Sequence, residues 1–241
     1  MVKPMNQDEL KALVAQEAVK EVLNMVKSHP KNIPFVIGIG TGSTANLFID
    51  ALAPHRELFA GAVSSSEASA ARLEKHGFVL MQANDIEFLP VYVDGADEID
   101  PQGNMLKGGG GALTREKIIA QLAKTFICIC DDTKAVKTLG AFPLAVEVIP
   151  LAYQQVSREL TALGARITLR VQKGETQKTF MTDNAAWIID VHGLRIDKPA
   201  ELESWINQIP GVICNGIFAR RKADILLMSN SLGVTHQEFK D

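Results

Sequence analysis

The sequence predicts an α/β fold: a mostly parallel, Rossmann-like layered domain with a smaller ferredoxin-like α+β domain inserted near its C-terminal end. Strand-like and helix-like segments alternate through the first half of the 241 residues, which is typical of a parallel sheet. From about residue 144 the order becomes β-α-β-β-α-β, the split βαβ pattern. A final apolar run at 223–230 again has the character of a buried strand. We therefore expect one domain at 1–143 and 220–241 and the other at 144–219.

The first half is punctuated by clear element signals. Residues 32–40 form a continuous apolar run that ends in glycines, as a buried parallel strand does. Ser64 and Glu67 have the spacing of a capping box before a helix at 68–77. Further strands are expected at 78–82, 89–94 and 125–130, and further helices at 44–52 and 114–124.

The second half follows the ferredoxin-like order. A polar loop at 173–184 joins the two central strands. The expected strands are 146–150, 166–172, 185–193 and 211–219, and the expected helices are 153–163 and 199–209. The run at 223–230 is expected to rejoin the first sheet.

Composition excludes several classes of protein. Apolar residues make up 46% and charged residues 22%, and the net charge of −3 gives no sign of a nucleic-acid surface. The amphipathic, charged N-terminus is not a signal peptide, and no apolar run approaches the roughly 20 residues of a membrane span. Cys128, Cys130 and Cys214 form no CxxC pair and are expected to be buried thiols, which fits a cytoplasmic location.

Glycines and hydroxyls meet at a strand-to-helix junction at 38–44. Glycines let a backbone approach a phosphate, and a helix N-terminus offers N–H groups and the positive end of its dipole. Thr41, Ser43 and Thr44 add hydroxyl donors. Ser43 stands where a dinucleotide fingerprint needs glycine, and the lysine of a P-loop is missing. The junction therefore indicates a phosphate cradle or a tight turn with a capping threonine, and disfavours NAD and ATP.

Two carboxylates follow an apolar run at the next candidate edge. Asp94 ends the run and Asp97 comes three residues later. In open α/β sheets, ligands collect at the carboxyl ends of the strands, although Asp and Gly are also common turn residues. A magnesium site would need a third ligand, and the sequence offers none nearby.

A lysine and four glycines come next. Lys107 precedes the run 108–111, whose amides can form an anion nest or oxyanion hole, or a flexible hinge. Glu116 follows in the first turn of a helix. There it is either a dipole-stabilised surface residue or a general base, for which burial and the dipole must balance.

These motifs together resemble the type A ribose-5-phosphate isomerase family. The resemblance is carried by GIGTGSTA, AVSSSEAS, YVDGADEID, LKGGGGALTREKIIA and the segment 128–134, and continues through VEVIP, MTDN, IIDVHG, IPGV and GIFA. It runs in order from about residue 7 to 235. Gly111 in place of a common alanine, a longer loop at 171–181 and a longer N-terminus depart from the family pattern.

The resemblance implies a reaction and a set of partners. The family interconverts D-ribose 5-phosphate and D-ribulose 5-phosphate in the non-oxidative pentose phosphate pathway. It uses no metal and no organic cofactor, and its members are dimers or tetramers. The expected partners are therefore the sugar phosphate and a second copy of the chain, with no nucleic acid and no membrane.

The resemblance also assigns residues. Glu116 is the implied base that moves a proton between C2 and C1 through an enediolate, with Asp94, Asp97 and Lys107 as further catalytic groups. The implied substrate contacts are Thr41, Gly42, Ser43, Thr44, Asp94, Gly95, Ala96, Asp97, Lys107, Gly108, Gly109, Gly110 and Lys134. The phosphate is expected either at the hydroxyls of 41–44 or at Lys134.

Two other readings of the same residues are kept. One is acyl transfer of the CoA-transferase type, in which Glu116 would be a nucleophile beside a glycine-rich oxyanion hole; the chain is short for such an enzyme. The other is a non-catalytic sugar-phosphate sensor, for which the first 30 residues are too few to hold a DNA-binding domain.

Overall fold

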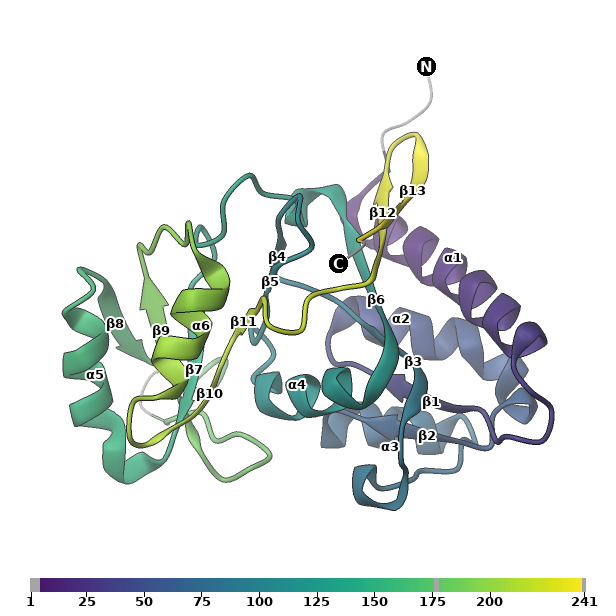
Figure 1. Cartoon of the computed structure of the whole chain (residues 1–241), viewed down its shortest axis with the longest axis horizontal. Helices are drawn as coiled ribbons and strands as arrows, with labels where there is room; N and C mark the ends of the chain where they lie inside the picture. Colours follow the sequence, from purple (N-terminus) through teal and green to yellow (C-terminus); the bar gives the residue numbers. More distant parts are fainter. Residues whose placement is uncertain (1–4, 176–177, 240–241) are drawn as a thin grey trace. The chain divides into compact units, whose positions relative to one another are not determined.

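The computed structural model describes residues 5–175 and 178–239, and within them the chain forms three β-sheets with helices around the two larger ones (Figure 1). Their contacts separate two compact units. The parallel-sheet unit holds the described residues up to Ala96, Ile118–Ala135 and those from Ala223 onward. The antiparallel unit holds the described residues of Asp97–Lys117 and Val136–Lys222. The expected fold class, a mostly parallel sheet plus an antiparallel α+β part, is confirmed.

The parallel-sheet unit is built on six strands in the order β13-β12-β6-β3-β1-β2. All neighbours are parallel except β12 and β13. The strands are β1 (Val36–Ile39), β2 (Gly61–Ser64), β3 (Leu89–Asp94), β6 (Ala123–Asp131), β12 (Ile225–Asn230) and β13 (Gly233–Glu238). The helices are α1 (Gln7–Ser28), α2 (Ser43–Leu52), α3 (Glu67–Lys75) and the short η1 (Ala53–Leu58), η2 (Ala83–Asp85) and η3 (Asp132–Lys134). Helix α4 (Leu113–Leu122) is divided between the units: its first turn belongs to the antiparallel unit, and its residues from Ile118 onward belong to the parallel-sheet unit. The run at 223–230 therefore does rejoin the first sheet.

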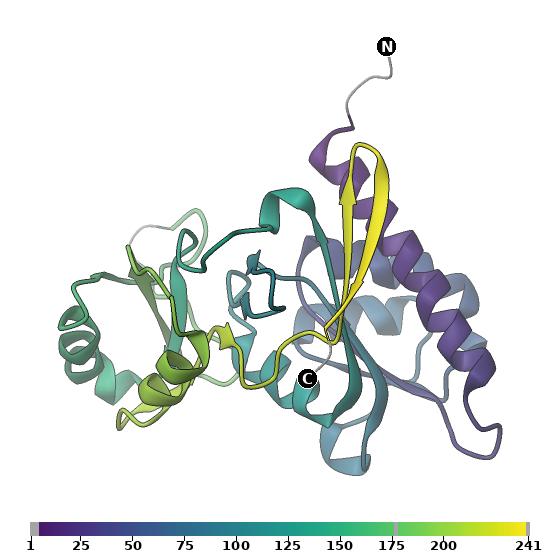
Figure 2. The same ribbon diagram turned by 45° about the horizontal axis from the view of Figure 1, so that its top comes forward.

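Helices cover both faces of this sheet. Successive residues of a strand point to opposite faces, and the residues on both faces are apolar. Ile37, Val91 and Ile127 share one face and pack in a buried cluster with α1 and α2. The long α1 runs past β6, β12 and β13 (Figure 2). On the other face, a Cβ added to Gly38 would lie 3.0 Å from the Ile119 side chain of α4. Residues buried on both sides explain why these strands read as continuous apolar runs.

Two local predictions in this unit were wrong. The run at 78–82 forms no strand and makes only an isolated bridge from Leu80 to Ala62. The N-cap of α3 is Ser66, not Ser64: its hydroxyl accepts from the Ser69 N–H at 3.1 Å. The Ser64 hydroxyl instead donates to the Ser66 carbonyl at 2.8 Å, which tightens the turn before the helix.

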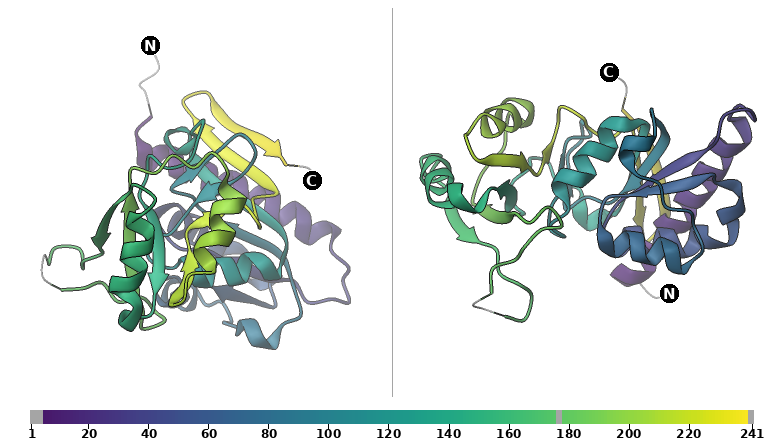
Figure 3. Two further views of the ribbon diagram at one scale, coloured as in Figure 1. Left: turned by 60° about the vertical axis from the view of Figure 1, so that its left-hand side comes forward. Right: turned by 90° about the horizontal axis from the view of Figure 1, so that it is seen from below.

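The antiparallel unit contains a four-stranded sheet in the order β10-β7-β9-β8. Its elements are β7 (Leu144–Val148), η4 (Pro150–Ala152), α5 (Tyr153–Thr161), β8 (Arg166–Leu169), β9 (Trp187–His192), α6 (Pro199–Asn207) and β10 (Val212–Asn215). The order along the chain is the predicted β-α-β-β-α-β. Helices α5 and α6 lie on one face of the sheet (Figure 3), where Val156 and Ile206 pack with Val146 and Ile189.

The sequence did not predict the third sheet, β11-β5-β4, which is formed by β4 (Glu98–Ile99), β5 (Met105–Leu106) and β11 (Ile217–Phe218). The single strand expected at 211–219 is wrong, because Gly216 divides it into β10 and β11. The Gly216 N–H donates to the Ala145 carbonyl at 2.8 Å, and its own carbonyl accepts from the Lys107 N–H at 2.9 Å. A Cβ here would lie 2.2 Å from the Lys107 oxygen, so only glycine allows the two chains to approach this closely.

The predicted domain boundaries stay a prediction, because compact packing does not show independent folding. By contacts, 97–117 and 136–143 belong with the antiparallel unit, whereas the prediction counted them in the parallel-sheet domain. Residues 1–4 and 240–241 of that predicted domain, and 176–177 of the loop at 171–181, lie outside the described residues. All three cysteines are buried free thiols, as expected. Among the described residues, no helix has the length and apolarity needed to cross a membrane.

Candidate active site

Asp94 ends β3 and is fully buried. Its carboxylate accepts from the Thr41 N–H at 3.1 Å, the Gly95 N–H at 2.7 Å and the Tyr92 hydroxyl at 2.5 Å. A Cβ on Gly40 would lie 1.9 Å from Asp94 Cγ, so the glycine makes room for this carboxylate. Three donors therefore satisfy the oxygens of this buried carboxylate. Asp94 thereby joins the ends of β1 and β3.

A cluster of hydroxyls surrounds Thr41. Its Oγ1 lies 2.7 Å from Ser65 Oγ and 2.8 Å from Ser66 Oγ. Ser69 donates to the Gly40 carbonyl at 2.8 Å and so closes the cluster against the loop after β1. The sequence analysis singled out Thr41 but gave no site role to Ser65, Ser66 or Ser69. The run of three serines before α3 was a signal for Ser65 and Ser66, whereas Ser69 lies inside the helix and had no signal of its own.

The remaining residues of this loop begin α2. Gly42 is the N-cap residue with φ of +121°, and no described atom would touch a Cβ there within 4 Å. Its glycine is therefore needed for backbone conformation and not for space. Ser43 is exposed and Thr44 is half-buried at the start of the helix. N–H groups at this helix start are suited to an anion.

Lys134 lies at the end of η3, directly after β6. Asp131 begins this turn: its carboxylate accepts from the Thr133 N–H at 3.1 Å and from the Thr133 hydroxyl. Lys134 itself is half-buried. Because β1, β2, β3 and β6 are parallel, Thr41, Ser65, Asp94 and Lys134 all follow the carboxyl edge of one sheet. The chain also reverses its direction of winding at β1, which lies between β2 and β3, and ligands of open α/β sheets bind at such switch points.

Glu116 and Lys107 form a buried ion pair in the antiparallel unit. Glu116 Oε2 lies 3.2 Å from Lys107 Nζ, with the side chains 4% and 3% exposed. Glu116 stands in the first turn of α4, as predicted, but the surface reading of this residue is wrong because helix α4 turns it inward. The Lys107 ammonium also lies 5.5 Å from the centre of the Phe218 ring. A carboxylate held dry beside a cation in this way is poised for proton transfer or nucleophilic attack.

Neighbours of Glu116 fix the first turn of α4. Thr114 Oγ1 donates to the fully buried Glu147 carboxylate. Arg115 donates to Asn184 Oδ1 at 2.9 Å and to the Asp183 carbonyl at 2.6 Å. These partners all lie in the antiparallel unit, so the backbone just before Glu116 is anchored there.

Lys117 provides the anchor on the other side. Its ammonium lies 2.6 Å from both Glu203 Oε1 and the Ile217 carbonyl. Glu203 is 3% exposed and also accepts from the Ala219 and Arg220 N–H groups at 2.9 and 2.8 Å. With residues 114, 115 and 117 each tied to the antiparallel unit, the Glu116 side chain has a fixed starting point, as a catalytic group needs.

The glycine run places Asp97 beside a backbone amide. The Gly109 N–H donates to Asp97 Oδ2 at 2.8 Å, and the Gly111 N–H donates to the Gly108 carbonyl at 3.0 Å, which closes a tight turn. Gly108 and Gly111 have positive φ values of +107° and +82°. The run therefore forms a hydrogen-bonded turn, and the Gly109 amide holds the carboxylate of Asp97.

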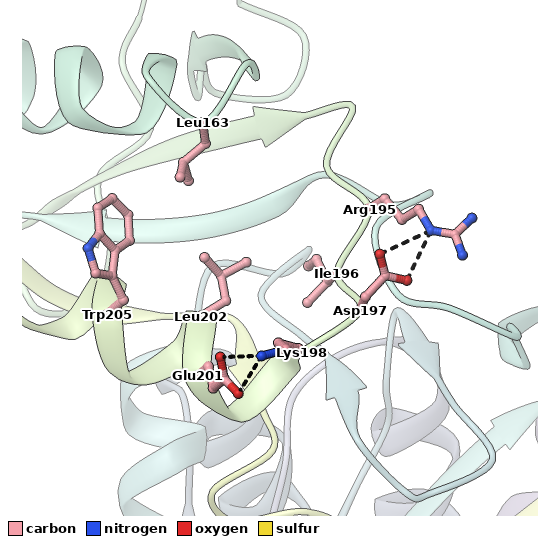
Figure 4. A pocket seen from close by; sticks show the side chains of 8 residues that line it. All are labelled: Leu163, Arg195, Ile196, Asp197, Lys198, Glu201, Leu202 and Trp205. Atoms are coloured by element: carbon pink, nitrogen blue, oxygen red, sulfur yellow. Dashed lines mark hydrogen bonds and ion pairs between the residues drawn. The ribbon is translucent and has the colours of Figure 1, made fainter.

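The predicted residues thus fall into two described groups. Thr41 to Thr44, Asp94 to Ala96 and Lys134 belong to the parallel-sheet unit, and Asp97, Lys107 to Gly110 and Glu116 belong to the antiparallel unit. A separate cavity of about 520 Å³ in the antiparallel unit contains none of them (Figure 4). Its lining combines Leu163, Ile196, Leu202 and Trp205 with the exposed ion pairs Arg195–Asp197 and Lys198–Glu201.

Comparisons with known proteins identify relatives of this chain. The family model described as ribose 5-phosphate isomerase A (phosphoriboisomerase A) matches residues 61–233. Ribose-5-phosphate isomerase A of Polynucleobacter asymbioticus is 56% identical over 237 residues, covering 95% of this chain and 98% of the relative.

Solved structures are similar over the whole length. Ribose 5-phosphate isomerase A from Neisseria gonorrhoeae is 41% identical with a TM-score of 0.89, covering 99% of this chain and 100% of that one. A D-ribose-5-phosphate isomerase in complex with phospho-erythronic acid is 38% identical with a TM-score of 0.86, covering 97% and 100%. These matches confirm the resemblance seen in the sequence: the chain belongs to the ribose 5-phosphate isomerase A family and is an aldose–ketose isomerase.

Proposed function

We propose that this isomerase works through an enediolate, with Glu116 as the base that carries the proton between C2 and C1. The observation that supports this most directly is the buried Glu116–Lys107 pair, 3.2 Å apart. In the forward direction the Glu116 carboxylate takes the proton from C2 of open-chain ribose 5-phosphate, and the electron pair moves toward the C1 carbonyl oxygen. The protonated Glu116 then returns the proton to C1, while the hydroxyl proton moves from the C2 oxygen to the C1 oxygen. No electron leaves the substrate, so the reaction is balanced without an oxidant or a co-reactant.

Lys107 is proposed to stabilise the charge on the enediolate oxygens. A fixed cation in a dry site costs little reorganisation when negative charge appears, and one such donor contributes roughly 3 kcal/mol to the transition state. In the resting state the Lys107 ammonium is paired with the Glu116 carboxylate. When Glu116 takes a proton its negative charge disappears, and the same ammonium becomes available to the new oxyanion.

Asp97 is the proposed carrier of the hydroxyl proton between the two oxygens. Asp97 is half-buried, and the Gly109 N–H donates to its Oδ2. This hydrogen bond fixes the plane of the carboxylate and therefore the direction in which Oδ1 points. Asp94 is the proposed organiser of the hydroxyl contacts. Its carboxylate accepts the N–H groups of Thr41 and Gly95 and so holds the backbone of both residues in place.

The phosphate is proposed to bind at the carboxyl edge of the parallel sheet. Thr41, Gly42, Ser43 and Thr44 offer hydroxyls and the amides of a helix start, and Lys134 offers a cation in the turn after β6, a parallel strand of the same sheet. Ala96 completes the substrate contacts through its backbone. The proposal includes no metal and no organic cofactor, a cytoplasmic location and a homodimer or homotetramer.

Glu116→Gln tests the proposal. The amide keeps the size of the side chain but cannot take a proton, so conversion of ribose 5-phosphate should fall at least about 1,000-fold, the scale of general-base catalysis. Glu201→Gln is the matched control, because Glu201 also lies in the first turn of a helix but is an exposed partner of Lys198. Both assays contain EDTA. Undiminished activity in Glu116→Gln would overturn the assigned role.

A further inference from the structure

Arg170 forms an ion pair with Asp190, and neither residue has a role in the mechanism above. Arg170 follows β8, and its side chain and that of its partner Asp190 on β9 are 14% and 16% exposed. Arg170 Nε donates to Asp190 Oδ2 at 2.9 Å and Nη2 donates to Oδ1, a two-point pair. The Arg170 N–H also donates to the Ile188 carbonyl at 2.9 Å. Arg170 is therefore fixed at its backbone by Ile188 and at its guanidinium by Asp190.

The remaining arm of this guanidinium reaches the glycine turn. Nη1 donates to the Gly108 carbonyl at 2.6 Å, and the same oxygen accepts the Gly111 N–H at 3.0 Å. The carbonyl is thus held by a charged donor and a backbone donor together. A hydrogen bond to a charged group is roughly twice as strong as a neutral one.

The Gly108 carbonyl and the Gly109 N–H are the two ends of one peptide unit. In a planar trans peptide these groups point in opposite directions. The oxygen end faces Arg170, and the N–H end donates to Asp97 Oδ2 at 2.8 Å. A cation on the oxygen strengthens the donor at the other end, because neighbouring hydrogen bonds polarise one another.

Glycines leave this turn without side chains that could set its orientation. They are required by space, since a Cβ on Gly109 would lie 2.7 Å from Asp97 Oδ1 and one on Gly108 would lie 2.8 Å from Ala145 Cβ. Glycine peptides flip easily because both signs of φ are open to them. A flipped 108–109 peptide would point its carbonyl at the Asp97 carboxylate, so a second interaction must hold the observed orientation.

We infer that Arg170, held by Asp190, is a positioning residue for Asp97: through its hydrogen bond to the Gly108 carbonyl it fixes the peptide whose N–H orients the Asp97 carboxylate. Arg170 acts through the peptide and is not itself a catalytic residue. The kinetic part of this inference rests on the role proposed for Asp97, whereas the geometric part does not.

The first experiment compares Arg170→Gln with Arg72→Gln in the full chain. Arg72 makes the same kind of two-point pair, with Asp50, and does not contact the glycine turn. Loss of a hydrogen bond to a charged group predicts that Arg170→Gln lowers kcat about 10- to 100-fold while KM stays within about threefold. Arg72→Gln should leave both unchanged. Arg170→Lys keeps a charge but not the fork, and should recover part of kcat. A kcat for Arg170→Gln within about twofold of the parent would overturn the inference.

The second experiment detects the peptide directly and does not depend on activity. The Gly109 amide resonance is followed by NMR in the parent, in Asp97→Ala, in Arg170→Gln and in the double variant. Asp97→Ala should move this resonance strongly in the parent and much less in Arg170→Gln, where the peptide no longer faces residue 97. An equal shift in both backgrounds would overturn the inference. Failure of the proposed function would instead show as a parent that does not convert ribose 5-phosphate although the coupled shifts are present.

Discussion

The carboxylate of Glu116 and the ammonium of Lys107 lie 3.2 Å apart and are almost entirely removed from solvent. Such a pair loses hydration on both partners, so it contributes little net stability, yet neither partner tolerates the loss of the other. This relationship favours a functional reason for the pair, because an apolar pair would fill the same space at lower cost. It also predicts how the two residues respond to substitution.

Lys107→Met should lower the free energy of unfolding by about 3 to 5 kcal/mol, because it leaves the Glu116 charge buried without its cation. The double variant Lys107→Met, Glu116→Gln removes both charges and should be more stable than Lys107→Met alone. Urea unfolding followed by circular dichroism measures both. Lys198→Met is the control, since its pair with Glu201 is exposed and should change stability by less than about 1 kcal/mol. Equal stability of Lys107→Met and the parent would show that the pair is not buried in solution.

Gly40→Ala should displace Asp94 and lower kcat/KM for ribose 5-phosphate by at least about tenfold, since a Cβ would lie 1.9 Å from Asp94 Cγ. Gly193→Ala is a useful comparison: its φ is +80° and no described atom lies within 4 Å of the added Cβ. That change costs only backbone strain, about 1 kcal/mol of stability, and should leave kcat/KM unchanged. A fully active Gly40→Ala would show that the position of Asp94 is not important for the reaction.

The buried thiols predict a pH dependence at the alkaline side. The side-chain hydrogen bond between the Cys130 thiol and Cys128, together with burial, raises the pKa of Cys130 well above its ordinary value, and burial raises the pKa of Cys214. Because the folded state keeps these protons longer than the unfolded state, their contribution is fully present below the unfolded thiol pKa of about 8.5 and is lost as pH rises above it. The free energy of unfolding should therefore fall above that pH, and Cys130→Ala with Cys214→Ala should flatten the fall.

Thiol labelling checks the same feature. Native protein at pH 8 should react slowly with DTNB, and all three cysteines should react after unfolding. Rapid labelling of Cys130 or Cys214 in the native protein would contradict their burial.

The proposed enediolate mechanism predicts that phospho-erythronic acid, which is bound to one similar protein of known structure, inhibits this chain competitively with ribose 5-phosphate. Its planar carboxylate resembles the two oxygens of the proposed enediolate, so Lys107→Ala should weaken inhibition by the same factor as it lowers kcat/KM. Erythritol 4-phosphate, which lacks the carboxylate, should bind both proteins similarly. Inhibition unaffected by Lys107→Ala would remove Lys107 from the enediolate site.

Much of the fold could be predicted because its signals are local. Apolar runs that end in glycine or aspartate located β1 and β3, and the change to β-α-β-β-α-β located the antiparallel sheet. Short strands such as β4 and β11 have two residues each and carry no periodic signal. Their pairing depends on Gly216, whose role appears only when Lys107 lies against it.

The site shows the same division. Asp94, Asp97, Lys107 and Glu116 lie within one short segment, so a family pattern could identify them, although spacing alone could not decide between a surface Glu116 and a buried one. Arg170 could not be found in this way. Its partners, Asp190 and the Gly108 carbonyl, come from distant parts of the chain, and a single arginine after a strand has no local signature.

The fate of the C2 hydrogen tests the central claim most directly. Ribose 5-phosphate deuterated at C2 is converted in ordinary water, and the label at C1 of ribulose 5-phosphate is measured by NMR. A proton carried on Glu116 as an enediolate forms can exchange with solvent before it is returned, so we predict that part of the label is lost to water and part appears at C1. Complete retention of the label at C1, together with unchanged label transfer in Glu116→Gln, would contradict Glu116 as the proton carrier.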